Sequence, residues 1–100
     1  MIGDMIEAVG IDGSGSMWVR PATTTFPHIY LEAMEVGWDE GRRCLYSPKP
    51  REWSYADWFK QIISAVRQQG VMLTLGTTTT WFSIDDALRK QIEEESVGWA

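Results

Sequence analysis

The sequence has little of what several large classes of protein require. Cys44 is the only cysteine, so no disulfide can form within one chain, and an unpaired thiol suits a reducing cytoplasm. No run of about 18 apolar residues occurs, which argues against a membrane-spanning helix. The segment from Met1 to Val9 carries Asp4 and Glu7 but no Lys or Arg, the wrong charge for a secretory signal. We therefore expect a cytoplasmic protein without a membrane partner.

Basic residues are also outnumbered. Nine Lys and Arg residues stand against fourteen Asp and Glu residues, which gives a net charge of −5. Proteins that bind nucleic acid draw most of their affinity from clustered Lys and Arg side chains against phosphates. The nearest cluster here has glutamates within it, and its members are Arg42, Arg43, Lys49 and Arg51. We therefore expect no nucleic-acid partner, whereas solubility, basic proteins or cationic small molecules suit an acidic surface.

Motifs of catalysis and metal binding are missing as well. His28 is the only histidine, which excludes a two-histidine metal site, and Cys44 is better explained as a half-buried thiol than as a nucleophile. No phosphate-binding glycine-rich loop or nucleophile elbow occurs. The segment 12–17 (Asp-Gly-Ser-Gly-Ser-Met) resembles the metal-binding motif of von Willebrand factor A domains, but a strand pattern follows it where that family has a helix. We interpret it as a hairpin loop and expect no catalytic, cofactor-binding or metal-binding residue.

Length and composition indicate one domain over residues 1–100. Hydrophobic residues make up 44% of the chain and charged residues 23%, both close to the averages of globular proteins. A chain of this length forms a single hydrophobic core in most cases.

Two helices are expected, a main one near 55–69 and a second one near 84–95. Ser54 is followed three residues later by Asp57, which is the pattern of a capping box. The second helix is expected to start after Ser83, which is its predicted cap. The apolar stripe of the main helix follows helical spacing, and its members are Tyr55, Trp58, Phe59, Ile62, Ile63 and Val66.

The other patterns predict a largely antiparallel sheet built from β-hairpins. Turn-forming residues separate three pairs of apolar or β-branched segments: 5–11 with 17–20, 71–75 with 78–82, and 35–38 with 42–46. The segment 26–36 is interpreted as a short helix, although an extended strand also fits it. The predicted fold is α+β, with the stripe of the main helix packed on the sheet.

Six tryptophans in 100 residues are the unusual feature of the composition. Tryptophan combines a large apolar area with one N–H donor, which suits interfaces and the mouths of pockets. Trp58 belongs to the core by its helical register, and Trp18 alternates with Met17 and Val19 along a strand. The candidates for an interface or pocket are Trp18, Trp38, Trp53, Trp81 and Trp99. The alternative is that all six fill one core.

Three segments resemble the small α+β proteins encoded by mobile integron gene cassettes. They are 36–39 (Val-Gly-Trp-Asp), 45–48 (Leu-Tyr-Ser-Pro) and 50–59 (Pro-Arg-Glu-Trp-Ser-Tyr-Ala-Asp-Trp-Phe). That group is largely without assigned function, and its members are often homo-oligomers. The resemblance therefore implies a compact, self-associating accessory protein, and it transfers no active-site residue.

Two hypotheses about function remain. The favoured one is a non-enzymatic accessory binding protein of immunity or adaptor type. It self-associates, with a dimer favoured, and acts through contact with a protein partner that the sequence does not identify. The alternative is a binder of small molecules, whose tryptophans and acidic residues form a pocket for a cationic ligand. An enzyme is disfavoured because no reactive group of residues is evident, and no cofactor is expected.

Overall fold

The structure is a computed structural model that describes residues 2–27, 29, 35–47 and 54–97. Its elements follow in the order β1 (Ile2–Ile11), β2 (Met17–Pro21), β3 (Gly37–Asp39), β4 (Cys44–Tyr46), α2 (Tyr55–Gln68), β5 (Val71–Thr74), β6 (Thr80–Phe82) and α3 (Asp86–Val97). The strands form one mixed, mostly antiparallel sheet, and helices pack on it, so the predicted α+β fold is confirmed.

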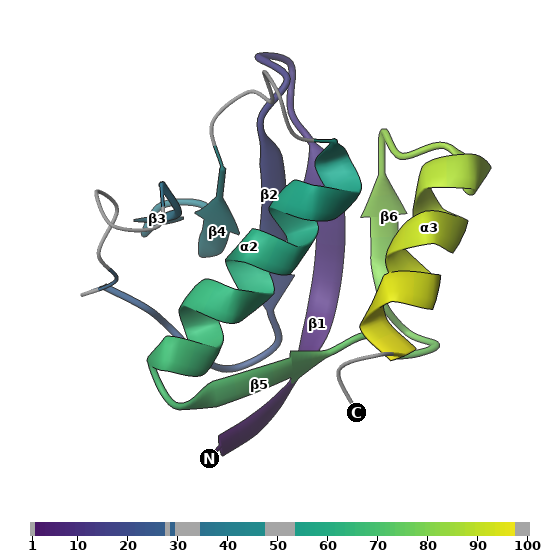
Figure 1. The fold of residues 1–100 in the computed structure, drawn as a ribbon. Coiled ribbons are helices and arrows are strands. Elements are labelled where there is room, and N and C mark those ends of the chain that lie inside the picture. The colour runs from purple at the N-terminus through teal and green to yellow at the C-terminus, as the bar shows by residue number, and fades with distance from the viewer. Residues whose placement is uncertain (1, 28, 30–34, 48–53, 98–100) are drawn as a thin grey trace.

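The long strand β1 organises the sheet. Strands run in the order β3-β4-β2-β1-β5, and β6 also pairs with β1. Because β1 has ten residues, one of its edges has room for two neighbours, β5 along its first half and β6 along its second (Figure 1). Both neighbours run parallel to β1, whereas the pairs β1–β2, β2–β4 and β3–β4 are antiparallel.

Two of the three predicted hairpins are confirmed. The pair β1–β2 joins the segments predicted at 5–11 and 17–20, and β3–β4 forms a shorter version of the pair predicted at 35–38 and 42–46. The prediction of a hairpin from 71–75 and 78–82 is wrong, because β5 and β6 each pair with β1.

The side chain of Thr79 explains why β5 and β6 do not pair with each other. Its hydroxyl donates to the carbonyl oxygen of Ile6 at 2.7 Å and accepts from the backbone N–H of Gly76 at 3.0 Å. At the same place along β1, the register of the pair β1–β2 shifts between Ile6 and Ala8. The connection is therefore fixed to β1, and the following strand continues along β1 instead of folding back onto β5.

Helix α2 forms as its sequence predicts. The hydroxyl of Ser54 accepts from the backbone N–H of Asp57 at 3.2 Å, and the Asp57 carboxylate accepts from the backbone N–H of Ser54 at 3.3 Å, which completes the capping box. Its apolar stripe is buried, including Trp58, Phe59 and Ile62. The short helix predicted over 26–36 lies mostly outside the described residues.

Helix α3 begins two residues later than predicted, and Ser83 is not its cap. The carboxylate of Asp85 accepts from the backbone N–H of Leu88 at 2.8 Å, which makes Asp85 the N-cap. Ser83 has a φ of 55° and belongs to the preceding turn. Ile92 is buried in the core that α2 also lines. No helix in the described part of the chain is long and apolar enough to cross a membrane.

The main core lies between the helices and one face of the sheet (Figure 1). Its largest fully buried side chains include Phe59, Ile6, Met17, Leu45, Ile62, Ile63, Leu73 and Ile92. A second, smaller cluster holds Ala8, Trp18 and Cys44, with Tyr46 packed against it, and contains no residue of α2 or α3. Strand alternation places this second cluster on the opposite face of the sheet.

Candidate functional site

One row of residues in cross-strand register runs across the sheet on the face opposite the helices. In order it contains Phe82 of β6, Gly10 of β1, Trp18 of β2, Tyr46 of β4 and Gly37 of β3. Residues directly opposite each other on neighbouring strands share a face, so the whole row lies on the side of the smaller cluster. We call Phe82, Trp18 and Tyr46 the aromatic strip.

The two glycines in the row make room for the aromatic rings. A Cβ atom added at Gly10 would overlap the indole ring of Trp18, and one added at Gly37 would lie 2.5 Å from the Tyr46 ring. Neither glycine has a positive φ, so the space above them, rather than backbone freedom, accounts for glycine here. The rings of Trp18 and Tyr46 therefore lie across the neighbouring strands.

Two arginines flank the strip at Trp18. The guanidinium carbons of Arg20 and Arg42 lie 5.1 Å and 5.6 Å from the centroid of the Trp18 ring. Arg42 also lies 3.5 Å from the carboxylate of Asp12, and Arg20 lies 4.0 Å from that of Glu7. The strip is thus flanked by two pairs of opposite charge.

The strip ends in an exposed ring. Phe82 is 47% exposed, and its ring centroid lies 5.6 Å from that of Trp18, which is itself only 7% exposed. Antiparallel strands that face water on one side carry polar residues there. This face presents the aromatic strip together with the polar residues Arg20, Thr80 and Asp39, which lie in register with Ala8 or Cys44. Ala8, Cys44 and Trp18 are buried within the chain, and Phe82 is the most exposed ring of the strip.

The thiol of Cys44, in the same cluster as Trp18, is not activated as a nucleophile. Cys44 is fully buried, and this burial raises the pKa of its thiol above the ordinary value, which outweighs the opposing effect of the Arg42 charge. A thiol that stays protonated and inaccessible is a poor nucleophile and a poor metal ligand. His28 lies outside the described residues.

The carboxylate of Asp12 is occupied by its own turn. One of its oxygens accepts from the Ser14 hydroxyl at 2.6 Å, from the Ser14 backbone at 2.9 Å and from the Ser16 backbone at 3.1 Å. The hydrogen bond from the Ser14 hydroxyl is the main cause of a pKa of Asp12 below its usual range. The interpretation of residues 12–17 as a hairpin loop is confirmed. No group of three His, Cys, Asp or Glu side chains in the described ranges could hold a metal ion.

The tryptophans predicted as interface or pocket residues lie in different parts of the structure. Trp18 lies at the centre of the aromatic strip. Trp38 packs on the main core, with its ring centroid 5.8 Å from that of Phe26, and Trp81 also packs on this core beneath the guanidinium of Arg89. Trp53 and Trp99 lie outside the described residues.

Sequence reasoning missed Phe82, Tyr46 and the two glycines of the row. Adjacent residues of a strand face opposite sides, so Trp81 and Phe82 cannot both point into one core. Glycine within a strand indicates the close approach of another group, and both Gly10 and Gly37 are such positions. These two signals were present in the sequence, whereas the row itself depends on the strand order.

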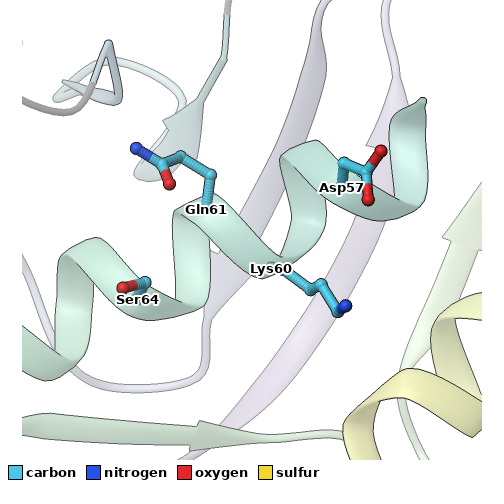
Figure 2. A pocket seen from close by; sticks show the side chains of 4 residues that line it. All are labelled: Asp57, Lys60, Gln61 and Ser64. Atoms are coloured by element: carbon cyan, nitrogen blue, oxygen red, sulfur yellow. The ribbon is translucent and has the colours of Figure 1, made fainter. Parts of the chain in front are cut away.

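The outer surface of α2 carries a hollow of about 470 Å³. The described residues that line it are Asp57, Lys60, Gln61 and Ser64. Figure 2 shows Lys60 and Gln61 projecting from opposite sides of the helix, so these polar groups do not converge on one point. No tryptophan is part of this described lining, and Asp57 already belongs to the capping box. The hollow therefore adds no support for the cationic-ligand alternative, which stays a prediction.

A mixed sheet with helices on one face and an aromatic strip on the other defines a small α+β protein. The family model of Integron Cassette Protein Hfx_Cass5 matches residues 4–79, and the chain belongs to this family. The resemblance expected from the sequence is thereby confirmed. The match ends before β6 and α3, so Phe82 lies beyond it.

A solved structure also resembles this chain. It is the integron cassette protein Hfx_Cass5 from the mobile metagenome of North West Arm Sewage Outfall, which is 45% identical. The similarity covers 97% of this chain and 98% of that chain, with a TM-score of 0.49. The comparison with curated proteins gives no match.

Proposed function

We propose that this chain is a non-enzymatic binding protein that self-associates by packing its aromatic strip against that of a second copy. The observation that carries this proposal is the row of Phe82, Trp18 and Tyr46 on the sheet face opposite α2 and α3. A sheet buries each apolar face against another layer. The helices supply that layer on one side, and a second copy supplies it on the other.

The shape of the surface supports a second copy as the occupant. Two sheets pack face to face at a separation of about 10 Å, with aligned or crossed strands. A two-fold axis brings the same patch of both copies together. The aromatic strip of one copy then packs on the aromatic strip of the other, and the exposed ring of Phe82 becomes buried in this contact.

The charges beside the strip are compatible with this pairing. Arg42 lies near Asp12, and Arg20 lies near Glu7, so each copy offers both signs of charge. Each arginine of one copy can therefore approach a carboxylate of the other copy, so that like charges are not placed opposite each other across the contact. A partner of one predominant charge would match this rim less well.

The state of the reactive side chains supports binding rather than catalysis. Cys44 is buried with a raised thiol pKa, and Asp12 is held by hydrogen bonds within its own turn. In our proposal these residues are structural supports of the strip, and the protein acts through protein–protein contact.

The test is the mass of the assembly before and after Phe82→Asp. Phe82 is half exposed in one copy, so the substitution leaves the fold intact, but in the pair it places two carboxylates in an apolar contact. Native mass spectrometry and light scattering should show that this variant has half the mass of the wild-type assembly.

The matched control is Ala87→Asp, which places the same charge at an exposed position of α3. It should keep the wild-type mass, and circular dichroism should show that both variants are folded. A wild type that stays a single chain at high micromolar concentration, or a Phe82→Asp variant of unchanged mass, would overturn the proposal.

A further inference from the structure

Few buried side chains hold β6 and α3 to the rest of the protein. Among residues 80–94, all of which the structure describes, Ile92 alone is buried. Trp81, Ile84 and Leu88 are half-buried and pack against the main core. By contrast, α2 places seven buried residues in that core. Segments with few buried apolar contacts open at a lower free energy than the core does.

The strand β6 and the helix α3 are joined to each other, and we call residues 80–97 the β6–α3 unit (Figure 1). The guanidinium carbon of Arg89 lies 5.2 Å from the centroid of the Trp81 ring, and Arg89 donates to the carboxylate of Glu93 at 2.7 Å. The carboxylate of Asp85 caps α3 by accepting from the backbone N–H of Leu88. These contacts lie within the unit, so they are kept when β6 and α3 move as one body.

The unit has a defined boundary at Thr79. The Thr79 hydroxyl donates to the carbonyl oxygen of Ile6 at 2.7 Å and accepts from the backbone N–H of Gly76 at 3.0 Å, and Thr79 is 7% exposed. The chain up to this residue is therefore fixed to β1 without the help of β6. Thr80, the next residue, is exposed and begins β6. A fixed residue at the end of an element is a suitable hinge position.

Two contacts hold the unit against the rest of the protein. The strand β6 pairs with β1 over three residues, opposite 8–10. The helix α3 packs beside α2, with the side chain of Ile92 buried in the main core. Both contacts are short, because β1 has ten residues and keeps β2 and β5 as neighbours when β6 is absent.

We propose that the β6–α3 unit is a lid, which opens as one body about the junction after Thr79 while the other strands and α2 stay folded. In the closed state, the ring centroid of Phe82 lies 5.6 Å from that of Trp18, which completes the aromatic strip. Opening removes Phe82 from Trp18 and frees the edge of β1 at residues 8–10. The lid therefore decides whether the strip is complete.

The lid also regulates self-association, and this part of the inference rests on the proposed function. A partner that binds only one of two states reduces the population of the other state as its concentration rises. The packing of strip on strip uses Phe82, so association holds the lid closed. The opening itself is a property of the single chain and needs no partner.

Hydrogen exchange of the folded protein, read by mass spectrometry at low micromolar concentration, tests the lid. The protected amides of β6 and α3 in the wild type should exchange together, at least about tenfold faster than those of β2 and α2. Ile92→Ala removes the buried side chain of the lid and should speed exchange of β6 and α3 by a further tenfold or so, with α2 unchanged. The matched control is Ile63→Ala, which removes the same atoms from α2 and should speed the exchange of α2.

Three results would overturn the lid. Equal acceleration of α2 and α3 in Ile92→Ala would mean that the whole protein opens at once. Faster exchange of α3 with unchanged β6 would mean that the helix frays by itself. Wild-type amides of β6 and α3 as slow as those of α2 would mean that no separate opening occurs. If Ile92→Ala does not fold, Ile92→Val takes its place, with an expected acceleration of about threefold.

The link to self-association is tested by repeating the exchange at high micromolar concentration. In the wild type, exchange of β6 and α3 should then slow, whereas in Phe82→Asp it should not depend on concentration. Wild-type rates that do not change with concentration would overturn the regulation and count against the strip contact, but they leave the opening of the lid standing. Conversely, an assembly that loses half its mass in Phe82→Asp, without separate exchange of β6 and α3, keeps the proposed function and overturns the lid.

Discussion

At the scale of single residues, Gly10 decides whether the aromatic strip can form. The indole ring of Trp18 occupies the space where any other residue at position 10 would place its Cβ atom. The ring is held there by Phe82 on one side and by the guanidinium groups of Arg20 and Arg42. Because Gly10 has a hydrogen atom where another residue would have its Cβ atom, the Trp18 ring can lie against β1 at this position.

Gly10→Ala should therefore lower the free energy of unfolding by about 1–3 kcal/mol, the usual cost of overpacking a filled site. Urea unfolding measures this change. Gly13→Ala is the matched control, since a Cβ atom at Gly13 meets nothing within 4 Å. Equal midpoints for Gly10→Ala and the wild type would show that Trp18 moves away at no cost.

A second residue-scale feature is the carboxylate of Asp4, which ties β1 to the segment after β2. It accepts from the Thr23 backbone and hydroxyl at 3.2 Å and 3.1 Å, and from those of Thr24 at 2.9 Å and 2.6 Å. Burial alone would raise the pKa of Asp4, but these hydrogen bonds outweigh it and hold the pKa below its usual range.

Asp4 should therefore make stability depend on pH. A carboxyl whose pKa is lowered on folding contributes stability above its unfolded pKa of about 3.9, and this contribution is lost as pH falls through the folded value. Asp4→Asn should lower the free energy of unfolding by about 1 kcal/mol at neutral pH, and the difference should shrink in acid. Urea melts at several pH values measure it. Glu94→Gln, at an exposed position of α3, should show no such trend.

At the scale of elements, α2 depends on the cap at its first turn. The hydroxyl of Ser54 satisfies a backbone N–H that no residue of the helix can reach. Ser54→Ala should lower the free energy of unfolding by about 1 kcal/mol. Ser64→Ala is the same change at an exposed position within the helix, where alanine is at least as favourable as serine. Equal thermal midpoints for the two variants would contradict the role of the cap.

The elements that sequence predicts well are those whose signals are local. The capping box of Ser54 and Asp57 and the turn at 12–17 lie within a few residues, and both are found as predicted. The hairpin predicted from 71–75 and 78–82 fails because its connection is fixed by Thr79 to Ile6, which is 73 residues away in the sequence. No local pattern contains that contact.

At the scale of the whole molecule, the candidate site shows a similar limit. A high tryptophan content indicated an interface, but Trp38 and Trp81 pack on the main core, and among the candidate tryptophans that the structure describes only Trp18 lies in the strip. The strip combines residues from β2, β4 and β6, and these become neighbours only when the order of strands is known. Sequence could identify the residue types, whereas the assembly of the sheet decides which of them meet.

The two parallel neighbours of β1 also bear on how the chain folds as it is made. The edge of β1 that receives β5 and β6 must wait for residues far along the sequence, since Ile6 and Thr79 are 73 residues apart. At a synthesis rate of about 5–20 residues per second, the delay is about 4–15 s. The antiparallel pairs β1–β2, β2–β4 and β3–β4 lie within the first 46 residues and can form earlier, so the sheet is completed only when most of the chain has left the ribosome.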